Sequence, residues 1–254
     1  MTSKDLSLAL LLSALIVVFP RQSLASGAIT PGSPPATANG LIHISSGGGQ
    51  AIVSYFEANR SYACDALPST STSNIAFASQ IGILGGAALT VTFRGDTTPA
   101  ITISGEDSNQ ANNRIAFTPD ASGKYELPIT TTVSQGEDVR IDCAETSLYG
   151  GYNTNINNFN FLELTNITNQ TISGAWTAVN WNGSFFIGTF VIPAGNRQDI
   201  SLHDVVGAGK YGSLIVTHDG PVGALVGNVS QYKGSATEFS LSATLPLHER
   251  VQMR

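Results

Sequence analysis

Residues 138–164 read Asp-Val-Arg-Ile-Asp-Cys-Ala-Glu-Thr-Ser-Leu-Tyr-Gly-Gly-Tyr-Asn-Thr-Asn-Ile-Asn-Asn-Phe-Asn-Phe-Leu-Glu-Leu. Apolar and polar side chains alternate from Val139 to Cys143, the pattern of a half-buried strand. The middle is rich in glycine and asparagine with little to bury, which predicts a linker over residues 149–158. Apolar residues resume at Phe159. The stretch therefore predicts that one β unit ends, a linker follows and a second unit begins.

The chain contains two cysteines, Cys64 and Cys143. In an exported protein two such residues usually form a disulfide, and here the bond would close a long loop in the first unit. Closing a loop of that length constrains the unfolded chain by about 4 kcal/mol. Two free, buried thiols are the alternative.

The N-terminus has the pattern of a secretory signal. A short, weakly basic start precedes a continuous apolar run from Leu6 to Phe19, and Ser23-Leu24-Ala25 offers small residues for cleavage. A membrane anchor is the alternative, but the run is shorter than the roughly 17–25 residues that a spanning helix needs. We therefore expect a signal peptide over residues 1–25, no transmembrane helix in the mature chain, and a secreted, periplasmic or extracellular location. The Pro-, Ser- and Gly-rich residues 26–40 predict a flexible leader.

Composition narrows the range of functions. Charged residues make up 12% of the chain, and the net charge is −6 without a basic cluster. Binding to a phosphate backbone requires concentrated lysine and arginine, so a nucleic acid partner is not expected. The 26 glycines and 11 prolines are spread along the chain, as in proteins of many short strands joined by turns.

Short alternating segments recur on both sides of the expected linker, and none has a helical period. The sequence predicts an all-β protein of two tandem antiparallel β-sandwich modules. The first module covers residues 41–148, the second covers residues 159–248, and residues 249–254 form a tail.

The dipeptide Asn182-Gly183 between two apolar runs is a strong hairpin signal. A two-residue loop would place Val179 opposite Phe186, and Trp176 opposite Thr189. Both faces of this hairpin would then carry bulky apolar groups, so that one face lines the core and the other meets a loop, the first module or a partner.

Residues 105–113 form the richest cluster of oxygen ligands in the sequence. Carboxylate and amide oxygens suit a hard cation, so Asp107 and Asn109 are candidate calcium ligands. A solvated loop is the alternative, and no other cofactor is expected. The four histidines lack zinc-ligand spacing, and His218 lies in an ordinary turn sequence.

Four aromatic residues are candidate ligand-binding residues because exposed rings can stack on sugars: Tyr149, Tyr152, Trp176 and Trp181. Alternatively, the two tryptophans are core or interface residues of the hairpin.

Residues 115–129, Ile-Ala-Phe-Thr-Pro-Asp-Ala-Ser-Gly-Lys-Tyr-Glu-Leu-Pro-Ile, resemble the late hairpin of bacterial pre-peptidase C-terminal domains, and Asn59-Arg-Ser-Tyr62 resembles their early strand turn. This resemblance implies a jelly-roll module that is not catalytic, that binds matrix or carbohydrate, and that sometimes takes calcium.

The second unit is similar to bacterial immunoglobulin-like β-sandwich modules. The similarity lies in Phe161-Leu-Glu-Leu-Thr-Asn166, the Trp181-Asn-Gly183 hairpin and Gly212-Ser-Leu-Ile-Val-Thr217. Fold similarity of this kind does not supply a function. We expect a non-catalytic secreted or cell-surface protein that binds a protein or carbohydrate or has a structural role; the alternative is a carbohydrate-directed accessory module or a secreted hydrolase.

Overall fold

A computed structural model describes the chain in these ranges: 40–45, 48–68, 75–83, 86, 88–94, 113–131, 136–155, 158–235 and 238–249. The expected signal peptide over residues 1–25 lies outside the described residues, as does the expected leader except for Gly40. Within the described residues no helix has the length and apolar character needed to cross a membrane. The described chain is almost entirely β, which confirms the all-β prediction.

The described residues of the N-terminal half, 40–145, contain ten strands. They are β1 (Gly40–Ile44), β2 (Gly49–Phe56), β3 (Tyr62–Pro68), β4 (Ile75–Phe77), β5 (Gln80–Ile83), β6 (Ala88–Thr90), β7 (Thr92–Phe93), β8 (Arg114–Phe117), β9 (Gly123–Thr131) and β10 (Glu137–Glu145). One sheet has the order β1-β10-β3-β8-β7, and a second has the order β2-β9-β5-β6, with β4 also paired to β9.

Apolar side chains from both sheets of this half share one core, to which Ile52, Leu127 and Ile141 belong. Cys64 and Cys143 face each other on the adjacent strands β3 and β10 and form a disulfide. The predicted pairing is therefore confirmed, and Cys64 is fully buried in the core.

The C-terminal half, residues 148–249, contains the remaining elements. They are β11 (Leu148–Asn153), β12 (Asn158–Asn166), β13 (Ile172–Asn180), β14 (Phe185–Ile192), β15 (Arg197–Ser201), α1 (Leu202–Val206), β16 (Tyr211–His218), β17 (Leu225–Ser235), β18 (Glu238–Pro246) and β19 (His248–Glu249). Two sheets, ordered β14-β13-β16-β11-β19 and β15-β12-β17-β18, share a second core that includes Trp176 and Leu162.

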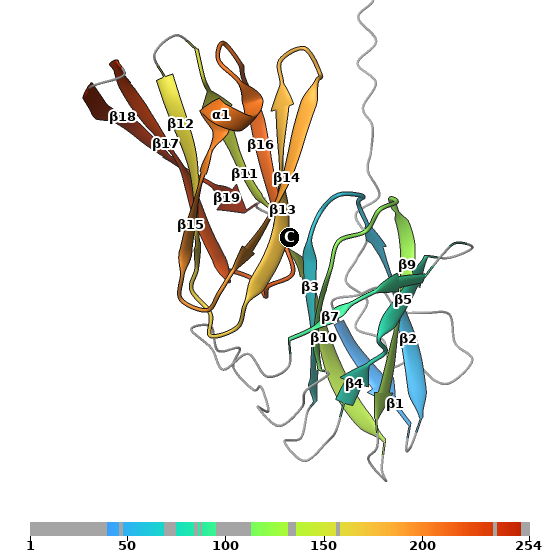
Figure 1. Ribbon diagram of the computed structural model, residues 1–254. Coiled ribbons are helices and arrows are strands. Elements are labelled where there is room, and N and C mark those ends of the chain that lie inside the picture. The colour runs from blue at the N-terminus through green and yellow to red at the C-terminus, as the bar shows by residue number, and fades with distance from the viewer. Residues whose placement is uncertain are drawn as a thin grey trace, which may run out of the picture.

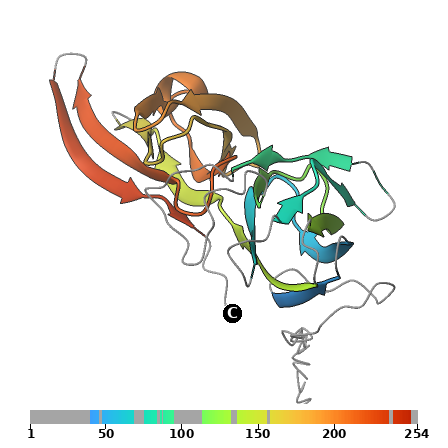
Figure 2. The ribbon, with the colours of Figure 1, turned by 90° about the horizontal axis from the view of Figure 1, so that it is seen from below.

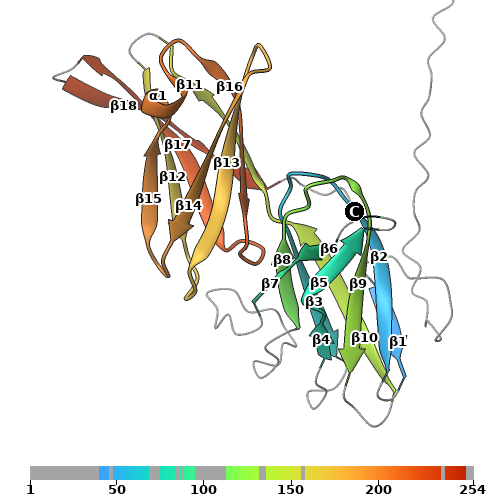
Figure 3. The ribbon, with the colours of Figure 1, turned by 45° about the vertical axis from the view of Figure 1, so that its right-hand side comes forward.

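Figure 1 shows the two halves beside each other, with the C-terminal half at the upper left. The long β17–β18 hairpin reaches beyond the other strands of its half, as Figures 2 and 3 show from two further directions. The halves meet at the segment that joins them. There the Thr146 amide donates to the Ser61 carbonyl (2.8 Å), and the Ser61 amide donates to the Ser147 hydroxyl (2.9 Å).

The predicted linker over residues 149–158 is wrong in its first half, because β11 occupies Leu148–Asn153 and pairs with β16 and β19. Gly150 serves close packing rather than a turn. A Cβ at Gly150 would lie 2.3 Å from Leu247 Cδ2, so Leu247 packs directly against the backbone of this strand. The expected tail also begins one residue too early, since Glu249 pairs with Leu148.

The predicted register of the Asn182-Gly183 hairpin is wrong by one residue. Val179 faces Phe185, and Trp176 faces Gly188. The Asn180 amide donates to the Ser184 carbonyl, while the Gly183 amide donates to the Asn180 carbonyl and Gly183 has φ +81°. These bonds define a three-residue loop with a glycine bulge instead of a two-residue loop. Trp176 is 3% exposed and points into the core.

Ser201 ends β15 and caps a single turn of helix, α1. The Ser201 hydroxyl accepts a bond from the Asp204 amide, the usual chemistry of an N-cap.

Candidate functional site

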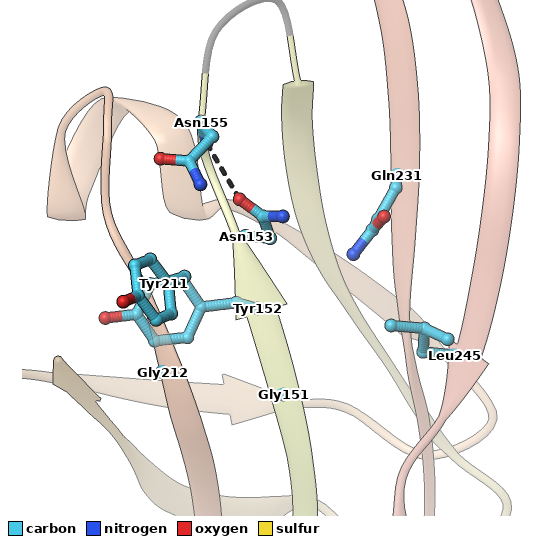
Figure 4. A pocket seen from close by; sticks show the side chains of 8 residues that line it. All are labelled: Gly151, Tyr152, Asn153, Asn155, Tyr211, Gly212, Gln231 and Leu245. Carbon is cyan, nitrogen blue, oxygen red and sulfur yellow. Dashed lines mark hydrogen bonds between the residues drawn. The ribbon is translucent and has the colours of Figure 1, made fainter. Parts of the chain in front are cut away.

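A shallow hollow opens at the base of the β17–β18 hairpin and has a volume of about 390 Å³. Its lining carries no charged side chain and comprises Gly151, Tyr152, Asn153, Asn155, Tyr211, Gly212, Gln231 and Leu245. In Figure 4, the tyrosines from β11 and β16 lie on one side, and Gln231 and Leu245 from β17 and β18 lie on the other. The hollow therefore offers aromatic surface and amide groups without charge.

Tyr152 lies at the floor of this hollow and is 3% exposed. Its hydroxyl donates to Asn180 Oδ1, and the Asn180 amide donates to the Ser184 hydroxyl (2.8 Å). The Ser184 hydroxyl in turn donates to Asn182 Oδ1 (2.7 Å). Burial raises the pKa of Tyr152, so this hydroxyl remains a donor at neutral pH. The chain of bonds fixes the hairpin tip to the floor of the hollow.

Trp181 at the hairpin tip stacks on Tyr211, with ring centroids 6.2 Å apart and planes 14° from parallel. The Trp181 amide also donates to the Tyr211 carbonyl (3.1 Å). Trp181 is 66% exposed and Tyr211 is 47% exposed, so a large aromatic surface faces solvent beside the hollow. Tyrosine and tryptophan are enriched at the energetic centres of interaction sites, which makes this pair a candidate contact surface.

The backbone of residues 153–155 is held in place by neighbouring side chains. The Asn153 amide N–H donates to Asn160 Oδ1 (2.6 Å), and the Asn155 N–H donates to Asn153 Oδ1 (3.0 Å). Behind them Thr154 is fully buried, and its hydroxyl donates to the Gly207 carbonyl (2.7 Å). The segment is therefore a fixed part of the site.

The four predicted aromatic residues occupy different environments. Tyr152 lines the hollow and Trp181 stacks beside it, whereas Trp176 is 3% exposed in the core. Tyr149 lies where the two halves meet, under the Arg60 guanidinium at 4.8 Å, and its hydroxyl donates to Glu145. Burial, together with Glu145, raises the pKa of Tyr149.

Tyr149 and Arg60 also line a second cavity of about 480 Å³, together with Glu57, His248 and Glu249. This cavity carries charges of both signs. Among the described residues, no three His, Cys, Asp or Glu side chains are grouped as a metal site would require. The calcium candidates Asp107 and Asn109 lie outside the described residues.

His218 is 2% exposed, at the end of β16. Burial is the main reason that its pKa falls to about 4, and the charge of Arg94 acts in the same direction. The His218 Nδ1 accepts a bond from the Gly220 amide (3.1 Å), as expected for a turn residue. His218 therefore serves the turn and the core.

Sequence reasoning missed Tyr211, Gln231 and Leu245. Their part in the hollow depends on β16 and β17 approaching β11, which no local pattern reveals. Searches against protein-family models and against curated protein sequences returned no match. The resemblances to pre-peptidase C-terminal and immunoglobulin-like modules therefore stay predictions.

Proposed function

We propose that this chain is a non-catalytic binding protein that works outside the cytoplasm and is built from two tandem β-sandwich modules. Two pairs of sheets with separate cores support the modular part of the proposal. The Cys64–Cys143 disulfide supports an oxidising compartment, where such bonds persist.

We further propose that its ligand is a neutral carbohydrate. The observation that carries this proposal is the uncharged hollow lined by Tyr152, Tyr211 and three side-chain amides. A sugar ring has an apolar face that can lie on an aromatic ring and a rim of hydroxyls that donate and accept hydrogen bonds. Amide side chains supply both donors and acceptors, and the absence of charge in the lining disfavours ionic ligands. A volume of about 390 Å³ lies in the usual range of small-ligand sites.

The test is calorimetric titration of the purified protein with cellohexaose, chitohexaose, laminarihexaose and mannohexaose. We expect one of them to bind, and Tyr211→Ala to weaken that binding at least tenfold through loss of the stacking surface. Tyr55→Ala is the matched control, because Tyr55 is a 61% exposed aromatic residue on β2 of the other half. If no saccharide binds, or if Tyr211→Ala and Tyr55→Ala have equal effects, the proposal is wrong.

A further inference from the structure

Strand β14 forms an edge of its sheet, and within the described residues it pairs only with β13. Its eight residues, Phe-Phe-Ile-Gly-Thr-Phe-Val-Ile, include neither a charge nor a proline. Phe185, Ile187 and Val191 are 64%, 61% and 61% exposed, all on the face away from the core. A charged side chain or a proline on an edge strand hinders pairing with another strand. A long apolar edge that has neither is a template for such pairing.

The other edges of the same half are protected. On β15, Arg197 pairs with Asp199 and with Glu163 across the strand. Strand β18 starts at Glu238, ends at Pro246 and has a register shift against β17, and β19 has only two residues. In the N-terminal half, edge strand β2 exposes a single large apolar side chain, Tyr55. Of the edge strands in the described part of the chain, β14 thus exposes the most large apolar side chains.

The hydrogen-bond pattern shows which backbone groups of β14 are available. The Asn180 amide donates to the Ser184 carbonyl, so Asn180 and Ser184 form a hydrogen-bonded pair at the start of the β13–β14 ladder. Such pairs alternate along an antiparallel ladder, so residues 186, 188, 190 and 192 bond to β13. The N–H and C=O groups of residues 185, 187, 189 and 191 consequently point outward from the sheet.

We propose that β14 pairs with β14 of a second copy of this chain, antiparallel about a two-fold axis at Gly188. This register places Phe185 opposite Val191 of the partner, and Ile187 opposite Thr189 of the partner. It joins the outward backbone groups of both copies and keeps every exposed side chain on the same face. An isologous interface of this kind closes on itself and makes a dimer instead of a fibre.

Two features favour a second copy over another partner. The strand is self-complementary in this register, and it carries no charge, so two chains with a net charge of −6 meet no like charges along it. At the axis the two Gly188 residues would form a close, non-hydrogen-bonded pair, which the missing side chains allow. Glycine is already required there, because a Cβ would lie 2.5 Å from the Trp176 ring. The proposal is independent of carbohydrate binding.

The test is sedimentation velocity of the purified protein from 1 to about 100 µM, for which we expect a concentration-dependent dimer. Ile187→Lys should weaken dimerisation at least tenfold, because a charge would enter the paired edge. Val226→Lys is the control, because Val226 is 52% exposed and lies on β17, in the other sheet of the same half. A folded wild-type protein that stays monomeric throughout, or an Ile187→Lys dimer as stable as the Val226→Lys dimer, overturns the proposal.

Amide hydrogen exchange on the wild-type protein makes the test independent of any variant that folds poorly. The amides of Ile187 and Thr189 should exchange slowly at high concentration and rapidly at low concentration. Rapid exchange of both amides at concentrations where the dimer prevails would place the interface elsewhere and contradict the proposal. Saccharide binding is also measured on the Ile187→Lys variant. This measurement separates a failure of the dimer proposal from a failure of the proposed saccharide binding.

Discussion

Arg94 and Asp219 form an ion pair that joins the two halves of the chain. Arg94 Nη2 lies 2.5 Å from Asp219 Oδ1, and Arg94 Nε donates to the Asp219 carbonyl (2.7 Å). A further guanidinium N–H donates to Gln170 Oε1 (3.1 Å) and to the Thr171 carbonyl (3.0 Å). The Arg94 side chain is only 8% exposed. Because a charge removed from water is costly unless it is fully bonded, this set of partners favours one arrangement of the halves.

Replacing Arg94 with Met should lower the free energy of unfolding by about 2 kcal/mol, because it leaves Asp219 without its charged partner. The measurement is urea unfolding followed by circular dichroism. Arg140→Met is the control, since the Arg140–Asp142 pair is 55% and 50% exposed and should contribute about 0.5 kcal/mol or less. Equal losses of unfolding free energy in the two variants would show that the Arg94–Asp219 ion pair does not hold the two halves together.

The buried His218 should make the protein less stable in acid. Its pKa is about 4 in the folded state, against an unperturbed value of 6.5. Above pH 6.5 the ring is neutral in both states. As the pH falls from 6.5 to 4, the unfolded chain takes up a proton that the folded chain does not, so stability is lost. The loss from this group is about 3 kcal/mol over that window.

Unfolding free energies measured at pH 7 and pH 4.5 test this expectation. The difference between the two pH values should shrink by about 2 kcal/mol or more in His218→Gln, whatever the stability of that variant at pH 7. His248→Gln, a change at an exposed histidine, should keep the wild-type difference. If His218→Gln kept the wild-type difference in unfolding free energy between pH 7 and pH 4.5, His218 would not be the cause of the acid sensitivity.

The loop glycine of the β13–β14 hairpin should be specifically required. Gly183 has φ +81°, and no atom lies within 4 Å of a Cβ built there. The cost of Gly183→Ala is therefore one of backbone strain alone, about 1 kcal/mol, seen as a lower melting temperature. Gly183→Asn should cost less, because asparagine tolerates this conformation better. If alanine and asparagine were equally tolerated, the observed loop would be wrong.

The disulfide should hold the N-terminal half in its folded state. It joins residues 79 positions apart, so the Cys64→Ala/Cys143→Ala double variant should lose about 4 kcal/mol of stability through the freedom gained by the unfolded chain. The measurement is urea unfolding of the variant beside the oxidised wild type. A loss below about 1 kcal/mol would show that the bond adds little to the packing around it.

The all-β class could be predicted because the period of two is a local property, as in the alternation of residues 239–245. The linker was misplaced because glycine has two uses. At Gly150 it allows Leu247 to pack close to the strand, whereas at Gly183 it allows a turn, and only tertiary neighbours separate the two cases. The one-residue register error had a similar origin, since loop length decided which residue of β14 lies opposite Trp176.

The candidate site could be predicted only in part. Tyr152 and Trp181 were identified as exposed or stacking aromatics from their residue type and their position near a connector and a turn. Nothing local marks Tyr211 or Gln231, because their contribution depends on which strands become neighbours. When several strands assemble a site, the sequence predicts only those of its residues that lie in a recognisable segment, such as a connector or a turn.

The most direct test of the binding site uses the two tryptophan indole signals of a ¹H–¹⁵N spectrum. Trp176 is buried and Trp181 is exposed beside the hollow, and Trp181→Ala assigns the two signals. On titration with the saccharide that binds in calorimetry, we predict that the Trp181 signal shifts in proportion to occupancy while the Trp176 signal stays in place. A saturated complex in which the Trp181 signal does not move would contradict binding at this end of the molecule.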